Sequence, residues 1–159
     1  MAPIIVPCIA GLDLPRVLNI ELASFTSPWI REMFADAVDE IRGTLGCVAR
    51  SVRGDVIGYG VCQIVAGEVD IHRVAVTQEW RRHGVGTHLL GWMMTKAGSK
   101  GARTVRLEVK ESNLSAQRLY ENAGFACIAR RPDYYKNPTD AALVYMCHGL
   151  RAKSRLPRA

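Results

Sequence analysis

A basic, glycine-containing segment is the part of this sequence best suited to bind an anion. It consists of Arg81-Arg82-His83-Gly84-Val85-Gly86-Thr87. An apolar, strand-like run that ends at Val76 precedes it, and an amphipathic, helix-like run follows it. Glycines let the backbone approach a ligand closely, and a helix N-terminus offers unpaired N–H groups with a partial positive charge. The segment therefore predicts an anion site; the alternative is a strand-to-helix turn that happens to be basic.

Two common phosphate-binding motifs do not match this segment. A P-loop requires two glycines separated by four residues and followed by Lys and Ser or Thr. Here Gly84 and Gly86 are two apart, and neither Lys-Ser nor Lys-Thr follows them. A dinucleotide-binding fingerprint requires a third glycine where this chain has Leu89. The pattern that remains is Arg81-x-x-Gly84-x-Gly86.

The apolar runs around this segment predict the elements that would position it. In chain order they are a strand over 3–10, helices over 13–25 and 29–41, strands over 45–53, 56–65 and 68–76, a helix over 85–97, a strand over 104–110, a short helix over 113–123, and strands over 125–130 and 142–148. Strands interleaved with helices and hairpins predict an α/β or α+β layered fold with a partly antiparallel sheet. Residues 1–150 are predicted to form one domain, and residues 151–159 a basic, disordered tail.

The strand over 68–76 contains a change of phase. Val69 and Ile71 alternate in one phase, whereas Val74 and Val76 alternate in the other. A β-bulge near His72-Arg73 would produce this slip and leave backbone groups unpaired just before the anion-binding segment. A strand buried on both faces near its end would give the same pattern. The first helix is expected to bury the stripe Leu14, Val17, Leu18, Leu22 and Phe25.

Composition sets broad limits on the function. Hydrophobic residues make up 48% of the 159 residues and charged residues 23%, which is typical of a globular protein. The net charge of +6 suits an anionic cofactor, an acidic acceptor or nucleic acid and does not choose among them. The N-terminus does not resemble a signal peptide, and no apolar run approaches the roughly 20 residues of a membrane span.

The cysteines predict neither a metal site nor disulfides. No Cys/His pair has zinc-binding spacing, so no metal is predicted. Each cysteine lies in an apolar run, which favours buried, reduced thiols and a cytoplasmic protein. The five cysteines are Cys8, Cys47, Cys62, Cys127 and Cys147.

A second set of spaced residues lies beyond the anion-binding segment. It comprises Leu107-Glu108-Val109, Asn113, Ala116, Leu119-Tyr120 and Gly124-Phe125. Together with Arg81-x-x-Gly84-x-Gly86, this set resembles the two signatures of the GCN5-related N-acetyltransferase (GNAT) superfamily, in the same order and spacing. Further pieces resemble the bacterial ribosomal-protein-alanine N-acetyltransferases, which modify a protein α-amine; they are Ser27-Pro28-Trp29, Arg130-Arg131 and Tyr134-Tyr135. The chain departs from that group at Arg73, where those enzymes tend to carry an Asn, and in the loop after Tyr135.

The resemblance implies a GNAT-like mixed sheet flanked by helices, with acetyl-CoA as the cofactor. It implies Glu108 as the general base, acting directly or through water, and Tyr120 as the general acid for the coenzyme A thiolate. The implied acceptor-binding residues are Pro28, Trp29, Tyr134 and Tyr135. The implied cofactor-binding residues are Val74, Val76, Arg81, Arg82, His83, Gly84, Val85, Gly86, Thr87, Asn113 and Tyr120.

Each implied catalytic role competes with a structural one. Glu108 lies between Arg106 and Lys110 on the polar side of its strand, where a solvated charge is the common case. Tyr120 lies on an apolar helical stripe, where core packing would explain it equally well. His72 is a rival base, because its ordinary pKa is close to neutrality and it lies on the strand beside the anion-binding segment.

The ordinary pKa values of amines favour one class of acceptor. An α-amine, with a pKa of about 7.7–8.0, is roughly one-tenth neutral at pH 7, whereas a lysine at ~10.4 is almost entirely charged. A single carboxylate is therefore better matched to a protein N-terminal α-amine, for example that of a ribosomal protein. The alternatives are a small-amine acetyltransferase acting on a polyamine, an amino acid or an aminoglycoside, and a non-catalytic acyl-CoA-sensing module. A nucleic-acid-binding domain would rest on charge alone, so neither a nucleic-acid partner nor a membrane is predicted.

Overall fold

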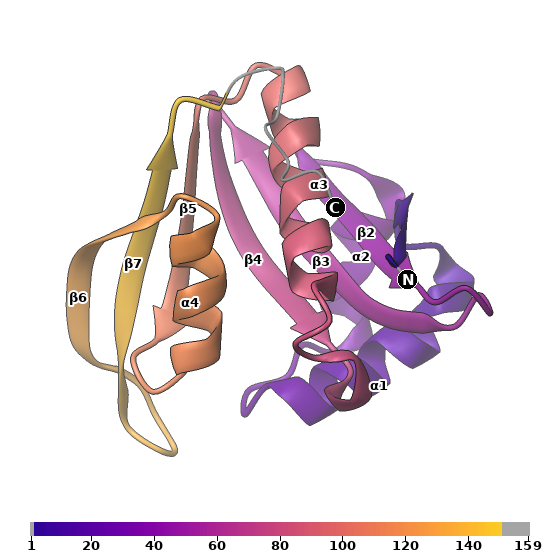
Figure 1. Cartoon of the computed structure of the whole chain (residues 1–159), viewed down its shortest axis with the longest axis horizontal. Helices are drawn as coiled ribbons and strands as arrows, with labels where there is room; N and C mark the ends of the chain where they lie inside the picture. The colour runs from indigo at the N-terminus through magenta and orange to yellow at the C-terminus, as the bar shows by residue number, and fades with distance from the viewer. Residues whose placement is uncertain (1, 151–159) are drawn as a thin grey trace.

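The computed structural model describes residues 2–150 and is built around one seven-stranded sheet (Figure 1). The strands lie side by side in the order β1-β2-β3-β4-β5-β7-β6. Neighbouring strands are antiparallel except β4 and β5, which are parallel. The predicted mixed, partly antiparallel sheet is thus confirmed. The strands are β1 (Ile4–Pro7), β2 (Thr44–Arg50), β3 (Val56–Val65), β4 (Glu68–Val76), β5 (Thr104–Lys110), β6 (Ala126–Tyr135) and β7 (Asp140–His148).

Helices cover the two faces of the sheet unequally. On one face lie α3 (Val85–Ser99) and α4 (Leu114–Asn122), which share a buried cluster with residues of β2 to β5 and β7. On the other face lie α1 (Leu14–Ser24), the 3₁₀ turn η2 (Arg31–Phe34) and α2 (Ala35–Asp39). The cluster under α1 and α2 draws its strand residues from β2, β3 and β4. On that side of β5, β7 and β6, the described chain places no helix (Figure 1).

The seam between β4 and β5 is the feature of the sheet that matters for function. The two strands pair only from Glu68 to Ile71 on β4 and from Thr104 to Leu107 on β5. Beyond Ile71 they diverge (Figure 1). Of the two explanations left open for the change of phase, the β-bulge is the correct one, because Ile71 pairs with Cys62 and Arg73 with Val61, which leaves His72 as the extra residue. The bulge bends β4 away from β5 just before the anion-binding segment.

Helix α3 is held close to the sheet by packing on β3. Its buried residues recur at helical spacing and include Leu89, Leu90 and Met93. Gly60 on β3 makes room for Met93, since a Cβ atom at Gly60 would lie 2.8 Å from the Met93 Cε atom. This packing places the α3 N-terminus near the C-terminal end of β4, on the side of the sheet where β4 and β5 have diverged (Figure 1).

Four expectations from the sequence are wrong. The stripe predicted for the first helix is out of phase, because Leu22 is 66% exposed while Glu21 is buried. The helix predicted over 29–41 is the turn η2 followed by the five residues of α2. The strand predicted over 125–130 continues to Tyr135, since Arg131 pairs with Ala142 and Tyr135 with Asp140 across the hairpin. Cys127, expected to be buried, is exposed.

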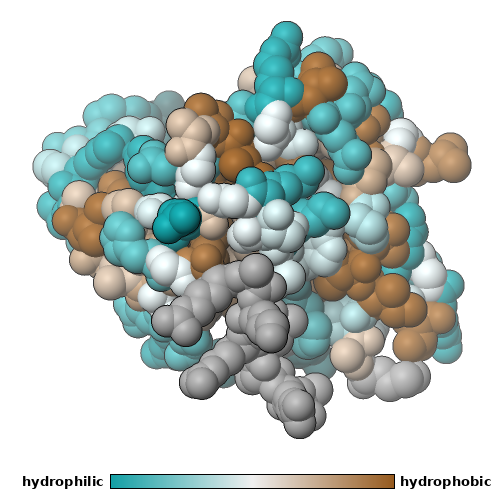
Figure 2. Space-filling view, turned by 90° about the horizontal axis from the view of Figure 1, so that it is seen from above, coloured by the Kyte–Doolittle hydropathy of each residue, from teal (hydrophilic) through white to brown (hydrophobic). Residues whose placement is uncertain are grey.

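The first strand, predicted over 3–10, is limited to β1. The predicted tail over 151–159 lies outside the described residues. None of the helices in residues 2–150 is long and apolar enough to cross a membrane. Figure 2 shows hydrophobic side chains interspersed with hydrophilic ones on the face seen from above, as is ordinary for a protein surface.

Candidate active site

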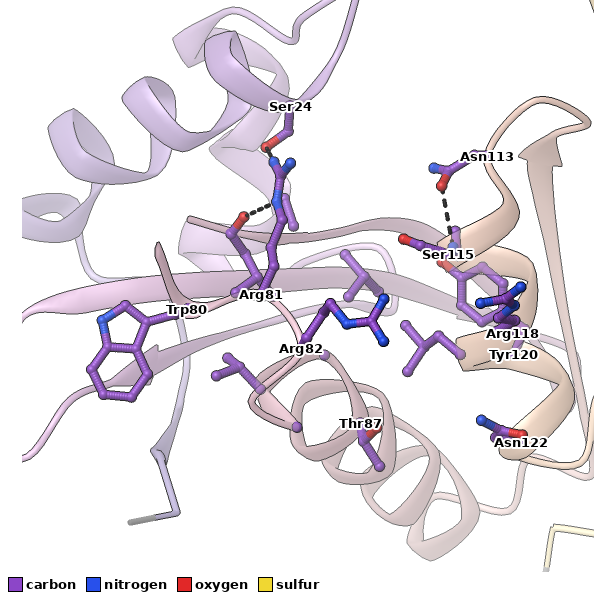
Figure 3. Close-up of a pocket in the computed structure, with 18 of the residues that line it drawn as sticks. Ser24, Trp80, Arg81, Arg82, Thr87, Asn113, Ser115, Arg118, Tyr120 and Asn122 are labelled. Carbon is purple, nitrogen blue, oxygen red and sulfur yellow. Dashed lines mark hydrogen bonds between the residues drawn. The ribbon is translucent and has the colours of Figure 1, made fainter. Parts of the chain in front are cut away.

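A pocket of about 530 Å³ opens where β4 and β5 diverge (Figure 3). Its walls come from both helical layers, because Phe25 lies at the end of α1 whereas Val85 and Tyr120 lie on α3 and α4. The pocket therefore reaches through the sheet at the seam. It is lined by Ser24, Phe25, Val74, Ala75, Val76, Trp80, Arg81, Arg82, Gly84, Val85, Gly86, Thr87, Asn113, Ser115, Ala116, Arg118, Leu119, Tyr120 and Asn122.

The N-terminus of α3 presents backbone N–H groups to this pocket. Gly84 is the N-cap residue and has a φ of 79°, and no side chain caps the helix. Arg82, two residues earlier, is also in the left-handed region, with a φ of 63°. A left-handed arginine is strained, and such strain is common where the backbone is shaped for a ligand. The first-turn N–H groups have no partner inside the helix, so this turn can accept a phosphate.

The two arginines of the turn have different surroundings. Arg81 donates from Nε to the Val76 carbonyl (3.0 Å) and from Nη2 to Ser24 Oγ (3.5 Å), which ties the turn to β4 and α1 (Figure 3). Arg82 extends from the turn toward α4, where Arg118 also lines the pocket (Figure 3). Arg82 and Arg118 can therefore supply positive charge at the phosphate end of the pocket. Arg118 had not been singled out from the sequence.

His83 differs from its predicted placement, since it is not one of the residues that line the pocket. Its Nδ1 lies 2.8 Å from the Arg81 carbonyl oxygen, and its ring lies beside Trp80, with 5.9 Å between the ring centroids. These contacts with Arg81 and Trp80 hold the His83 side chain outside the pocket lining. A contact between His83 and a phosphate is thus not favoured by the geometry.

Asn113 and Tyr120 line the pocket from α4. The Asn113 side chain caps the helix by accepting from the Ala116 N–H (3.1 Å) (Figure 3). The Tyr120 ring is buried beside Phe125, with 5.8 Å between the centroids. Burial raises the pKa of Tyr120 to about 12. The phenol consequently keeps its proton at neutral pH and can donate it.

Glu108 lies on the opposite face of β5 from the core that packs against α3 and α4. Its neighbours Leu107 and Val109 are buried in that core, whereas the Glu108 carboxylate accepts from Arg106 Nη2 (3.0 Å) and Arg131 Nη1 (3.1 Å). The Tyr134 hydroxyl also donates to Glu108, and this bond raises the pKa of Tyr134. Glu108 is therefore held by three donors on the uncovered part of the sheet and does not line the pocket.

The rival base, His72, is the extra residue of the β-bulge. Its side chain is exposed at the surface, although partial desolvation beside the Trp29 ring (6.1 Å between centroids) still lowers its pKa. The negative charge of Asp70 raises the pKa of His72, whereas the positive charge of Arg73 lowers it. His72 and Glu108 thus lie on neighbouring strands near the seam, and neither lines the pocket itself.

The predicted acceptor-binding residues lie on two separate segments, which form the two edges of an open surface beside Glu108. Pro28 and Trp29 belong to the loop after α1, whereas Tyr134 and Tyr135 end β6, with their rings 5.1 Å apart. Lys110 joins the two edges. Its Nζ donates to Thr26 Oγ1 (2.8 Å) and lies 5.2 Å from the centroid of the Tyr135 ring.

Comparison with known proteins identifies the family. The family model described as "Acetyltransferase (GNAT) family" matches residues 14–125. The chain belongs to the GNAT family of acetyltransferases. Its relatives include the ribosomal protein bS18-alanine N-acetyltransferase of Haemophilus influenzae, which is 31% identical over 147 residues, covering 91% of this chain and 98% of the relative. The family inferred from the two sequence signatures is thus confirmed.

Solved structures share the fold over almost the whole chain. The crystal structure of the Escherichia coli ribosomal-protein-S18-alanine N-acetyltransferase has a TM-score of 0.82 at 26% identity and covers 98% of this chain and 99% of that one. Arabidopsis thaliana NAA60, solved in complex with acetyl-CoA, has a TM-score of 0.81 at 20% identity, with 92% of this chain and 98% of that one covered. The GNAT-like sheet expected from the resemblance is confirmed.

One group of residues at this GNAT site was missed from the sequence. The Glu21 side chain is fully buried and accepts from Arg73 Nε (2.9 Å), from the Trp29 backbone N–H (2.8 Å) and from the Tyr59 hydroxyl. The available signal was positional, because Glu21 follows Leu14 and Val17 at the spacing of one helix face. A charged residue on the buried face of a helix predicts an ion-pair partner, and here that partner is Arg73 in the β4 bulge.

Proposed function

We propose that this protein is an acetyl-CoA-dependent N-acetyltransferase whose acceptor is the α-amine of a protein or peptide N-terminus. The observation that carries the proposal is the pocket that passes through the β4–β5 seam. It has an uncapped helix N-terminus on one side of the sheet. Glu108 lies on β5 one residue beyond the last β4–β5 pair, with its carboxylate on the other side of the sheet. A cofactor and an acceptor that enter from opposite faces would meet at this seam.

The cofactor is assigned to the side of the pocket formed by α3 and α4. The pyrophosphate of acetyl-CoA would bind the N–H groups of the first turn of α3, with Arg82 and Arg118 adding charge-assisted hydrogen bonds. The pantetheine arm would lie along β4 at Val74 and Val76, where the strand edge is no longer paired with β5. Asn113 would bind this arm through its side-chain amide, since its side-chain oxygen caps α4.

The chemistry divides between two residues on opposite sides of the seam. Acetyl-CoA would supply the acetyl group: a bond forms between the acceptor nitrogen and the acetyl carbon, the thioester C–S bond breaks, and coenzyme A leaves as a thiolate. Tyr120, buried and protonated at neutral pH, would donate a proton to that thiolate. Glu108 would take one proton from the attacking amine, directly or through a water molecule. One proton is removed from the amine and one is supplied to the thiolate, so the overall transfer is balanced.

The acceptor class follows from the two edges beside Glu108. The loop after α1 and the end of β6 face each other across the uncovered strands, an arrangement suited to an extended peptide. The bS18-alanine N-acetyltransferase relatives, by their names, act on a protein N-terminus, which supports the same class. Trp29 and Tyr135 lie at the two edges, where aromatic rings can pack against a peptide backbone.

The test is release of the coenzyme A thiol in the presence of acetyl-CoA and a panel of amines. The panel contains short peptides with free N-termini, the same peptides with blocked N-termini, a polyamine, free amino acids and an aminoglycoside. We expect turnover with the free peptides and none with the blocked ones. Turnover with the polyamine or the aminoglycoside alone would overturn the proposed acceptor while leaving the acetyltransferase class intact.

A further inference from the structure

Two arginines compete for one carboxylate in the proposed acceptor groove, the space between the loop after α1 and the end of β6. Arg106 on β5 and Arg131 on β6 both donate to the same oxygen, Glu108 Oε1, at 3.0 Å and 3.1 Å. In residues 2–150, Glu108 is the one carboxylate within ion-pair distance of either guanidinium. Each guanidinium carries five N–H donors, so most of these donors remain available. The pair therefore has the charge and the donors to bind a second carboxylate.

The location of these arginines favours a ligand that enters from solvent. Their side chains are 39% and 49% exposed, and they lie on the part of the sheet that no described helix covers. The Arg131 guanidinium also lies over the Tyr134 ring, 5.8 Å from its centroid, which orients its donors. Lys110 adds a positive charge nearby, where it is held by the Thr26 hydroxyl and the Tyr135 ring.

Other carboxylates near this groove do not occupy the arginines. Asp140 accepts from the Ser112 hydroxyl. Asp70 is an exposed residue opposite Arg106 in the parallel register, outside ion-pair distance within the described chain. Glu111 pairs with Arg130, whose register partner Leu143 belongs to the opposite face of the sheet. Arg131 and Arg130 are thus sequence neighbours that serve opposite faces.

We propose that the acceptor is a peptide with an Asp or Glu side chain within its first few residues, and that this carboxylate binds Arg131 and Arg106. The inference rests on the proposed function and specifies its substrate class. Binding would transfer the arginine hydrogen bonds from Glu108 to the acceptor carboxylate. Glu108 Oε1 would then be free to take the proton of the α-amine, so an acidic acceptor would both bind and release the base.

The experiment compares peptides that differ only in charge. Each begins with Ala and carries Glu, Gln or Lys at the second and third positions, and kcat/KM is measured by thiol release. We expect the Glu peptide to exceed the Gln peptide by about tenfold or more, as expected for hydrogen bonds between charged groups, and the Lys peptide to be the poorest. Raising the salt concentration should reduce the preference. Equal values for the peptides, or a preference for Lys, would overturn the inference.

Variants of the arginines test whether the preference for the Glu peptide depends on Arg131. Arg131→Met should bring the Glu and Gln peptides to within about twofold of each other, because the donor fork is removed. Arg130→Met is the matched control and should keep the wild-type preference, since Arg130 lies on the other face. If Arg131→Met fails to fold, Arg106→Met provides the same test from β5. Retention of the full preference in a folded Arg131→Met or Arg106→Met protein would overturn the assignment.

The outcomes separate this inference from the proposed function. Turnover of all peptides without charge preference would remove the acidic acceptor and keep the peptide acceptor. Turnover of free glutamate or aspartate with no turnover of any peptide would overturn both, since the arginines would then serve a small acidic amine.

Discussion

Arg73 and Glu21 form an ion pair between the bulge of β4 and the inner face of α1, with 2.9 Å between Nε and Oε1. The Arg73 guanidinium also lies 4.3 Å from the centroid of the Phe25 ring and 4.7 Å from that of Trp29. The pair holds the end of α1 and the loop that follows it against β4. This part of the chain forms one wall of the pocket and one edge of the proposed acceptor groove. Because the Glu21 side chain is fully buried, this contact bears on stability as well as on the site.

Replacement of Arg73 by Met should therefore destabilise the protein. It leaves the Glu21 carboxylate buried without its cation, and breaking a buried pair from one side costs about 3–5 kcal/mol. Urea unfolding measures the loss. The double variant Glu21→Gln with Arg73→Met should recover part of it, because a buried amide requires no cation. A single variant as stable as the wild type would show that Tyr59 and the Trp29 N–H suffice for Glu21.

The proposed binding of phosphate by the turn at the α3 N-terminus can be tested with Gly84→Val. A side chain at a φ of 79° is strained by about 1–2 kcal/mol, and relief of that strain would move the N–H groups of the turn. We expect acetyl-CoA affinity, measured by calorimetry, to fall by at least about tenfold, or roughly 1.4 kcal/mol. Gly54→Val is the matched control, because Gly54 has a φ of 91° in the β2–β3 turn and does not line the pocket. Equal affinities in the two variants would remove the phosphate assignment from this turn.

Tyr120→Phe removes a proton donor and keeps the buried ring. We expect kcat to fall by about 10²-fold with little change in acetyl-CoA affinity. Tyr145→Phe is the control, since Tyr145 is also buried but bonds Glu121 (3.0 Å) outside the pocket. If kcat is unaltered in Tyr120→Phe under conditions where chemistry limits turnover, Tyr120 serves the core alone.

The same tyrosine predicts a change of stability at alkaline pH. Burial raises the pKa of Tyr120 to about 12, above the value of about 10 expected in the unfolded chain. Its contribution to stability is complete below pH ~10 and is lost as pH rises from ~10 toward ~12. Tyr120→Phe should therefore lose less stability than the wild type over this range, as measured by denaturant unfolding at several pH values. Parallel losses in the two proteins would contradict the shifted pKa.

The base can be tested together with the acceptor class. Glu108→Gln should lower kcat/KM at neutral pH, and the deficit should shrink as pH rises, because solvent then supplies the neutral amine. Recovery should be centred near pH ~8 for an α-amine and above ~10 for a lysine or a polyamine. Glu111→Gln is the matched control, because Glu111 pairs with Arg130 away from the groove. A deficit in kcat/KM that stays constant with pH would contradict Glu108 as the general base and would favour His72.

The sequence by itself determined the features that local chemistry specifies. Gly84 supplies a left-handed N-cap, and the place of Asn113 before a helix produces its cap. Each depends on residues within a few positions of one another, so the backbone conformation follows from the residue types. Gly84 and Asn113 belong to the two family signatures, which is why those signatures identified the fold. The change of phase around His72 left two explanations open, and pairing with β3 decided for the bulge.

Only the tertiary structure decided which distant side chains meet. Arg131 is 23 residues from Glu108, and Arg73 is 52 residues from Glu21, yet each pair is in contact. In the sequence these charges resemble ordinary solvated ones, because nothing local reveals whether a partner will be brought within reach. Strand register places Arg131 on the face of Glu108 and Arg130 on the other, and the bulge turns Arg73 toward α1. The packing of the sheet thus decides which charges can bind a substrate and which hold the scaffold.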